Sequence, residues 1–396
     1  MVFAACLASA GCLGPKAVQQ TRTRYNEVYR STSDEQLLMN IVRLRYADSP
    51  VFIDLPHITS QFELAAGGSD PGPSGSQTNF GVAGLWGRDT PTLSYHPREG
   101  REIAKALLTP LSAELFSIVN AGANIEQLLL MTINDINDVP NAPQATAMVP
   151  RVPDGNAEFL QGVRLLNTLQ DRGAVELALQ TTEDAGVSSD PIPEALVQGR
   201  DVLSAAKDGY VYRAKTGGRM ALLKQEKGLV LKVRPRYVHS PEMEELARLF
   251  RVAPGLSRYK IESELTGDTE NRSPNPLGED TVFLNMRSIL QIMVFLSKGV
   301  CVPEEHIATG VAPTTLNPDG SPFDWTRVTA GHFFVASQKH RPRDSEVAVH
   351  YRGYWFSIAR NDVNSRAVLA ILEILSSLQE SDGKTVGPLL TLPLGG

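Results

Sequence analysis

The chain has 396 residues, of which 42% are hydrophobic and 21% are charged, and its formal net charge is −6 at pH 7. This composition indicates a globular protein of two or three domains and excludes disorder as the main state. The negative charge excludes a global basic surface, so no nucleic-acid partner is predicted.

The N-terminus carries no charge before Lys16, and its first thirteen residues are apolar or small. This run is shorter than the roughly 20 residues that span a bilayer, but it has the length of the apolar part of a signal peptide. The sequence ASAGC (8–12) is similar to a bacterial lipobox, in which the thiol of Cys12 would receive a diacylglycerol. FAAC (3–6) is a second candidate, with Cys6 as the acceptor, and an ordinary buried N-terminal helix is the alternative.

Leu13 follows the lipobox cysteine, whereas in such lipoproteins an Asp at this position tends to retain the protein in the inner membrane. The resemblance therefore implies an N-terminal lipid in the outer membrane, with the protein on the periplasmic side. Membrane contact would be made through this lipid anchor.

A capping-box pattern, Ser33 followed three residues later by Gln36, predicts a helix that begins there and ends near Asp48-Ser49-Pro50. Residues 51–66 read as extended, and apolar positions alternate again over 79–86. These patterns predict a long β-hairpin with its tip at 66–78 and a further extended piece at 92–95.

The predicted hairpin arms, 56–65 and 79–88, combine glycines with large apolar residues and have the length of membrane-spanning strands. We consider three roles: packing on the body of the protein, an arm that reaches a partner chain, and a strand pair of a shared barrel. A lone hairpin has open edges that lipid does not tolerate, so insertion demands oligomerisation. Alternation would place Phe80, Val82 and Trp86 on one side and Leu85 on the other. The candidate assembly residues are Phe62, Leu64, Phe80, Val82, Leu85 and Trp86.

Four prolines in residues 138–155 make this segment the best candidate for a linker. Before it, helices are predicted at 96–108, at 111–121 and from a capping signal at Asn124. The predicted organisation is a signal peptide (1–12), an N-terminal helix, hairpin and helical domain (13–137), the linker, and a second domain (156–396).

The second domain shows helical and extended patterns without strict alternation, which predicts an α+β fold with a mainly antiparallel sheet. Helices are predicted at 156–171, 196–207, from Ser240, at 283–296 as a buried core helix, and at 361–379. Strands are predicted at 175–182, 210–236 with turns at 217–218 and 227–228, 259–265, 346–358 and 388–394.

Familiar catalytic and nucleotide-binding patterns are missing from the sequence, which has no phosphate-binding loop, nucleophile elbow, H-E-x-x-H or paired C-x-x-C. We therefore predict no catalytic residue, no bound cofactor and no metal ligand. The densest acid and histidine group is Glu304-Glu305-His306, but adjacent residues on a helix do not face one another. Cys301, between two valines, predicts a small buried hydrophobic side chain, and one body cysteine permits no disulfide framework.

Both ends of the chain resemble an uncharacterised family of outer-membrane lipoproteins from Gram-negative bacteria. The likeness lies in SDEQLLMNIVRLRYADSPVFID (33–54), TPTLSYHP (90–97), the segment 351–379 and GPLLTLPLG (387–395). That family carries no assigned activity, so the resemblance implies the lipoprotein character and nothing finer.

Together these patterns predict a periplasm-facing outer-membrane lipoprotein with a structural or assembly role, as a subunit of an oligomeric cell-envelope complex. Its partners would be further copies of the chain or other envelope proteins, and a shared pore is one form of such an assembly. The alternative is a periplasmic hydrolase whose site lies in loop 267–280 or loop 307–325.

Overall fold

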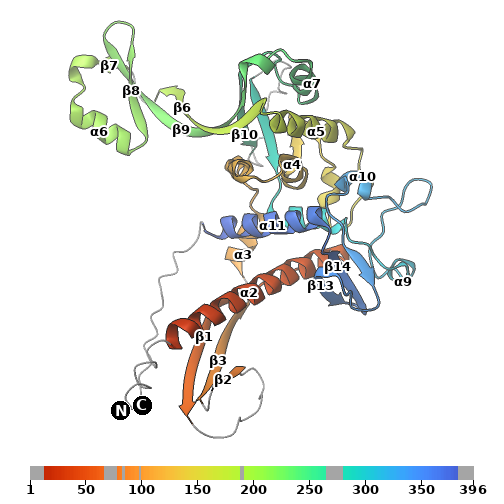
Figure 1. Cartoon of the computed structure of the whole chain (residues 1–396). Coiled ribbons are helices and arrows are strands. Elements are labelled where there is room, and N and C mark those ends of the chain that lie inside the picture. The colour runs from red at the N-terminus through yellow and green to blue at the C-terminus, as the bar shows by residue number, and fades with distance from the viewer. Residues whose placement is uncertain are drawn as a thin grey trace, which may run out of the picture. The chain divides into compact units, whose positions relative to one another are not determined.

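The computed structural model describes residues 13–66, 78–82, 85–97, 100–187, 191–264 and 280–381 (Figure 1). Helices and sheets are mixed in these residues, and most strand pairs are antiparallel, which confirms the α+β prediction. The chain forms two compact units: the smaller is Ser49–Lys105, and the larger combines the residues up to Asp48 with those from Ala106 onward. No helix among the described residues is both long enough and apolar enough to cross a bilayer.

The smaller unit contains a three-stranded antiparallel sheet in the order β1-β3-β2. Its strands are β1 (Ile53–Ala66), β2 (Thr78–Val82) and β3 (Leu85–Pro97). The β1–β3 register runs from Ile53 opposite Pro97 to Ala66 opposite Leu85. Helix α3 (Arg101–Leu108) follows and continues into the larger unit.

This register differs from the predicted pairing of 56–65 with 79–88. The second predicted arm is divided between two strands, because β2 pairs with β3 on the side opposite β1. Alternation holds only along a continuous strand, so the break between Val82 and Leu85 changes which positions share a face. The expected grouping of Phe80 with Trp86 on one face is therefore wrong.

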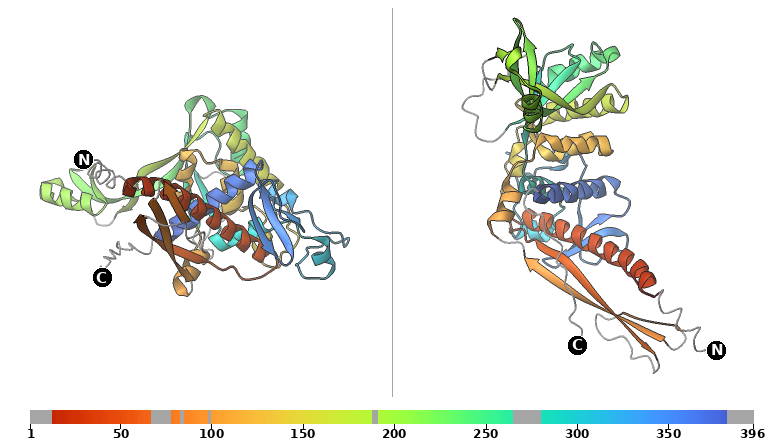
Figure 2. Two further views of the ribbon diagram at one scale, coloured as in Figure 1. Left: turned by 60° about the horizontal axis from the view of Figure 1, so that its bottom comes forward. Right: turned by 90° about the vertical axis from the view of Figure 1, so that its left-hand side faces the viewer.

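Five helices of the larger unit stack in the order α2, α11, α4, α5, α7 (Figure 2). They are α2 (Leu13–Arg45), α4 (Ile125–Thr132), α5 (Ala157–Asp171), α7 (Pro241–Leu249) and α11 (Val363–Ser381). The remaining described helices are α6 (Gly199–Lys207), α8 (Ile289–Ser297), α9 (Glu304–Ala308) and α10 (Thr326–Thr329). Short 3₁₀ segments are η2 (Ala113–Ala121), η3 (Pro143–Thr146), η4 (Glu194–Leu196) and η5 (Pro235–Tyr237).

An eight-stranded sheet has the order β5-β4-β11-β10-β9-β6, and β7 and β8 also pair with β9. All of its pairs are antiparallel except β10–β11. The strands are β4 (Ile133–Ile136), β5 (Val139–Pro140), β6 (Val175–Val187), β7 (Ile192–Pro193), β8 (Tyr210–Lys215), β9 (Arg219–Val233), β10 (Arg258–Glu264) and β11 (Thr281–Met286). A third sheet has the order β12-β14-β13, from β12 (Ala336–Gln338), β13 (Ser345–Tyr351) and β14 (Tyr354–Ala359).

Local capping chemistry starts several of these helices. The Asn124 side chain accepts the Gln127 backbone N–H at 3.0 Å, and Ser240 caps α7 in the same way, as predicted. The Ser33 signal fails, because α2 runs through it without interruption. The neighbouring Thr32 hydroxyl donates to carbonyls of the preceding turn, which is how a hydroxyl residue is accommodated inside a helix.

The apolar segment 283–296 is not one helix, as predicted, because β11 ends at Met286 and α8 begins at Ile289. The division is made by a capping box at Ser288 and Gln291, with N···O distances of 2.9 and 3.3 Å. The expected turn at 227–228 is also absent, since β9 pairs with β6 through both positions. The predicted strand at 388–394 lies outside the described residues.

The predicted linker 138–155 is not a domain boundary but part of the larger unit, with Val139, Asn141, Ala142 and Ala145 buried. Fully buried Arg287 ties this segment to the end of α4. Its guanidinium donates to the carbonyls of Leu130, Met131 and Asn141 and to the Asn134 side chain, over 2.6 to 3.2 Å. Burial lowers the pKa of Arg287 to about 9, so its charge is kept at neutral pH. Within this proline-rich stretch, the Asn141 carbonyl is thus bonded to Arg287, and those of Ala147 and Pro150 accept from Lys298 and Thr315.

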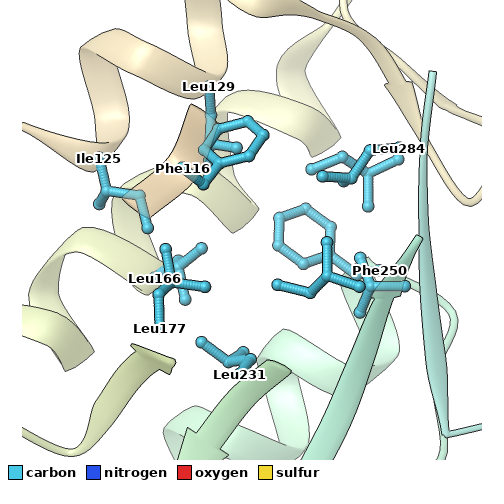
Figure 3. Close-up of a pocket in the computed structure, with 11 residues that line it drawn as sticks. Phe116, Ile125, Leu129, Leu166, Leu177, Leu231, Phe250 and Leu284 are labelled. Carbon is cyan, nitrogen blue, oxygen red and sulfur yellow. The ribbon is translucent and has the colours of Figure 1, made fainter. Parts of the chain in front are cut away.

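The core between the helices and the large sheet encloses an apolar cavity of about 40 Å³ (Figure 3). It is lined by Phe116, Ile125, Leu129, Ile136, Leu166, Leu177, Leu231, Phe250, Ile261, Val282 and Leu284. With no polar group in its wall, this cavity is a packing gap that excludes water.

Candidate functional site

Two parts of the molecule are candidates for function: the sheet of the smaller unit, which holds the residues singled out from the sequence, and a charged cluster at the end of α2. Cys12 lies outside the described residues. The six predicted assembly residues all lie on β1, β2 or β3.

The register places five of these six residues on one face of the sheet. Leu64 and Phe80 both pair with Gly87, from opposite sides of the central strand. Leu85 pairs with Val82, and Phe62 pairs with Asp89, at alternate positions of the same strand. Directly paired residues, and residues two apart, share a face. Trp86 therefore occupies the opposite face, paired with Ala65 and Gly81.

The second candidate is a group of charged and aromatic side chains around the C-terminal end of α2, which we call the α2-end cluster. It combines residues from α2, the end of α8, α9 and the β13–β14 turn: Arg45, Tyr46, Asp48, Lys298, Cys301, Glu305, His306, Tyr351, Arg352 and Tyr354. Figure 1 shows β13, β14 and α9 next to this end of α2, and α2 contacts β13.

Tyr46 and His306 form the buried centre of the α2-end cluster. The Tyr46 hydroxyl lies 2.7 Å from Nδ1 of His306, and both side chains are buried. Burial raises the pKa of Tyr46 to about 12, against the opposing effects of Arg45 and Arg352. The phenol therefore stays neutral at physiological pH and serves as a hydrogen-bonding group.

Asp48 joins the end of α2 to the turn between β13 and β14. It accepts hydrogen bonds from the Tyr351 hydroxyl and, at 2.9 Å, from Nη2 of Arg352. The Tyr351 hydrogen bond is the largest cause of the lowered pKa of Asp48, and Arg352 adds to it. Arg352 and Gly353 have φ values of 47° and 83°, the left-handed conformation of a tight two-residue hairpin turn, which positions this guanidinium.

The acid and histidine group noted in the sequence is divided between different partners. His306 bonds to Tyr46, whereas Glu305 accepts a 2.8 Å hydrogen bond from Tyr354 and lies 3.7 Å from Nζ of Lys339. Among the described residues, no group of three or more His, Cys, Asp or Glu side chains could hold a metal ion.

Lys298 and Arg45 are the least satisfied cations of the α2-end cluster. Lys298 is 5% exposed, and its Nζ donates to the Ala147 carbonyl at 3.1 Å and lies 5.9 Å from the ring centroid of Trp325. Burial, with the nearby charge of Arg45, lowers the pKa of Lys298 to about 7. Burial likewise lowers the pKa of Arg45, while Tyr46 and Cys301 act in the opposite direction.

Cys301 is exposed, not buried as its two valine neighbours predict, although Val300 and Val302 are buried. A short parallel bridge between Val300 and Val335 fixes this segment, and Cys301 N donates to the Val335 carbonyl. Side chains alternate along such an extended segment, so burying both valines directs the cysteine outward.

A partly buried contact between a histidine and an acidic residue, His332 and Glu126, lies at the start of α4. Nε2 of His332 is 3.1 Å from Glu126, and Nε of Arg164 is 3.5 Å from the same carboxylate oxygen. Nδ1 of His332 is buried and has no hydrogen-bond partner among the described residues.

Two acidic residues of loop 307–325 are engaged in local turns. Asp319 accepts hydrogen bonds from Ser321, and Asp324 accepts hydrogen bonds from Thr326. Of loop 267–280, only residue 280 is described. Comparison of the chain with protein-family models, curated proteins and solved structures finds no match.

Sequence reasoning singled out neither Arg45 nor Lys298, whose hydrogen-bond partners lie far away in the chain. One available signal was a Lys placed directly after the most apolar segment, where its charge must lie at the border of the core.

Proposed function

We propose that the chain is a lipoprotein anchored through Cys12 to the periplasmic side of the outer membrane, with a structural role as a subunit of an oligomeric envelope complex. The lipobox-like ASAGC sequence supports the anchor. The smaller unit, Ser49–Lys105, would make the contacts between subunits.

The observation that carries this proposal is the strand β1. It has 14 residues and is an outer strand of the sheet in the smaller unit. At roughly 3.3 Å per residue it extends for about 45 Å. An outer strand of this length presents a row of backbone N–H and C=O groups that can pair with a strand of another chain. It also exceeds the roughly 9–11 residues of a membrane-spanning strand, so a shared barrel is compatible with it.

The residue pattern on this sheet supports contact with a partner. Phe62, Leu64, Phe80, Val82 and Leu85 occupy positions on one face. A three-stranded sheet is stable on its own only when such a face is covered. Pairing of β1 edges between copies would extend the sheet and place these faces side by side on one larger apolar surface.

A second part of the chain supports an assembly role. Residues 192–223, which contain α6, β7 and β8, bury only three side chains, those of Ala205, Ala221 and Leu223. Leu196, Val202 and Leu203 are 66%, 45% and 67% exposed. An element with so little core and with grouped exposed apolar residues gains stability from a neighbouring chain.

The test is the particle mass of the purified protein in mild detergent, compared with two single proline variants, Ser60→Pro and Gln61→Pro. Adjacent residues of an antiparallel strand direct their N–H groups to opposite sides. One proline therefore breaks the β1–β3 ladder, and the other blocks only the outer edge, so each variant is the matched control of the other.

We expect a discrete high-mass particle for the wild-type chain. The proline variant that keeps its fold, judged by circular dichroism, should be a monomer. Deleting 66–88 should also give a folded monomer, and Cys12→Ser should release the protein from membranes. A folded edge variant that keeps the wild-type mass would refute pairing through β1. A wild-type monomer that turns over a substrate would favour the hydrolase alternative.

A further inference from the structure

One face of the third sheet carries a row of polar and aromatic side chains. The register places Gln338 of β12 and His350 of β13 on either side of Trp355 of β14. Directly paired residues share a face, so these three side chains form a row across the whole sheet. Gln338 and His350 are exposed and Trp355 is half-buried, whereas the next residues along two of the strands, Val349 and Phe356, are buried.

The row next to it on the same face holds only small side chains. Two residues along each strand, Ala336, Ser357 and Ala348 pair with one another across the sheet. No large side chain of this second row covers the indole of Trp355. Within the two rows, Trp355 is therefore the single large apolar ring, and polar groups of Gln338 and His350 stand on both sides of it.

Arg341 lies over this indole without using its hydrogen-bond donors. Its Cζ is 5.2 Å from the centroid of the Trp355 ring. An arginine that contacts a ring through its charge keeps its five N–H groups for other partners. Among the described residues Arg341 makes no hydrogen bond and no ion pair through its side chain. The ring thus holds a guanidinium whose donors are all free.

The loop 339–344, which joins β12 to β13, gives this side of the sheet an excess of positive charge. Nζ of Lys339 lies 3.7 Å from Glu305, so this charge is offset. Arg341 and Arg343 are exposed, and neither forms an ion pair with a described residue, Asp344 included. In a chain whose net charge is −6, such a local excess attracts an anionic partner.

The composition of this face favours an acidic glycan among the possible anionic partners. A lipid surface is entered by exposed apolar side chains, and beyond the half-buried indole the two rows offer only alanine. Single-stranded nucleic acid stacks successive bases on successive aromatic rings, whereas the two rows hold one indole.

A sugar ring needs one apolar platform for its C–H groups and neighbours that donate and accept hydrogen bonds for its hydroxyls. Trp355 provides the platform. The Gln338 amide nitrogen donates to the His340 carbonyl at 2.8 Å, which leaves the amide oxygen as an acceptor. The His350 ring lies 5.3 Å from the indole and adds a group that can donate or accept.

We propose that this face binds a carboxylated glycan. A sugar ring packs against the indole of Trp355 beside Arg341, and its hydroxyls bond to Gln338 and His350. The guanidinium groups of Arg341 and Arg343 hold the carboxylates, for which arginine is suited by its two parallel donors. The row crosses three strands, about 10 Å, so the glycan runs across the strands. This face belongs to the larger unit and does not depend on the proposed assembly function.

The experiment is calorimetric titration of the full wild-type chain with hexagalacturonate at constant ionic strength. Three probes of the same number of units are compared with it. Its methyl ester keeps the sugar rings but has no charge, hexa-aspartate keeps the carboxylates without sugar, and a hexadeoxyadenylate tests nucleic acid. These comparisons need no variant, so they do not depend on the folding of one.

Three variants then locate the binding: Arg341→Gln, Trp355→Leu and Arg236→Gln. Arg236 is exposed and its Cζ lies 4.7 Å from the centroid of the Tyr237 ring. Arg236→Gln therefore removes the same charge and the same kind of arginine–aromatic contact at another place, and it is the matched control for Arg341→Gln.

We expect saturable binding of hexagalacturonate and at least about tenfold weaker binding of the other three probes. The dissociation constant of hexagalacturonate should rise by about tenfold in Arg341→Gln, which removes charge-assisted hydrogen bonds, and in Trp355→Leu, which removes the platform. It should be unchanged in Arg236→Gln.

Absence of saturable hexagalacturonate binding would overturn the proposal. Equally tight binding of the ester, of hexa-aspartate or of the oligonucleotide would overturn the acidic glycan as the partner. An equal loss of affinity in Arg236→Gln and Arg341→Gln would reduce the effect to general charge.

A second measurement places the probe on the wild-type chain. Phenylglyoxal modifies accessible arginine side chains, and mass spectrometry of the peptides gives the rate at each position. Saturating hexagalacturonate should slow the modification of Arg341 and leave that of Arg236 unchanged. A rate at Arg341 that is the same with and without the probe would refute binding at this face.

Discussion

The pH dependence of stability should depend on one buried amine, Lys298. Its pKa is about 7 in the folded chain, against 10.5 for an ordinary lysine. Between these two values the unfolded chain binds more protons than the folded chain, so the free energy of unfolding rises with pH. Below pH 7 both states hold the proton, and the full penalty of the buried charge is present.

The magnitude follows from the size of the shift. Each pKa unit corresponds to about 1.4 kcal/mol, so the complete transition is worth about 5 kcal/mol. From pH 7.5 to pH 9.5 the wild-type chain should gain about 2.5 kcal/mol of stability from this group. Lys298→Met removes the charge and also the donor to the Ala147 carbonyl, which costs about 1–3 kcal/mol. The variant should therefore be more stable than the wild type at pH 6 and lose this advantage by pH 10.

The assay is urea unfolding, followed by circular dichroism, at several pH values between 6 and 10 and without phosphate or carboxylate buffers. The informative quantity is the difference between the two unfolding free energies, because other groups titrate equally in both chains. Lys232→Met serves as the exposed control, and its curve should run parallel to that of the wild type. A Lys298→Met curve that is also parallel would refute a lowered pKa for Lys298 in the folded chain.

Three further variants test the core. Arg287→Met removes one donor from each of three backbone carbonyls, of which that of Leu130 keeps the Asn141 amide, and should lower the unfolding free energy by about 3–5 kcal/mol in urea titrations; a loss below 1 kcal/mol would contradict the network. Val282→Ile adds one methylene toward the 40 Å³ cavity and should raise the urea midpoint by the equivalent of about 0.5–1 kcal/mol, whereas a decrease would show that the wall cannot accept it. Gly299→Ala places a Cβ 2.3 Å from the Phe333 carbonyl oxygen and should cost about 2 kcal/mol or more, seen as a lower melting temperature; an unchanged value would contradict this close approach.

Structural features that depend on side chains only a few residues apart were predictable from the sequence. Asn124 and Ser240 each bond a backbone N–H three residues ahead, so the sequence alone identifies both helix starts. The same pattern at Ser33 does not mark a helix start, because the helix already begins at Leu13 and runs through this position. No residue close to Ser33 indicates that the helix continues.

Pairing between distant segments was not predictable from alternation. The pattern over 79–86 does not reveal a break between Val82 and Leu85, and this break decides that β3, not β2, pairs with β1. The proline-rich segment 138–155 was predicted to be a linker because the neighbouring sequence shows no hydrogen-bond donors for its backbone carbonyls. Three of its donors, Arg287, Lys298 and Thr315, are more than a hundred positions away in the chain.

Arg287 and Arg45 differ in burial and in how completely their N–H donors are used. Arg287 is fully buried, yet it has acceptors at Nε, Nη1 and Nη2, and its plane lies 4.1 Å from the centroid of Phe295. Four of its five N–H donors are bonded to protein acceptors, so this side chain joins elements of the fold. Arg45 is partly exposed, and among the described residues its Nη1 has an acceptor whereas its Nε has none.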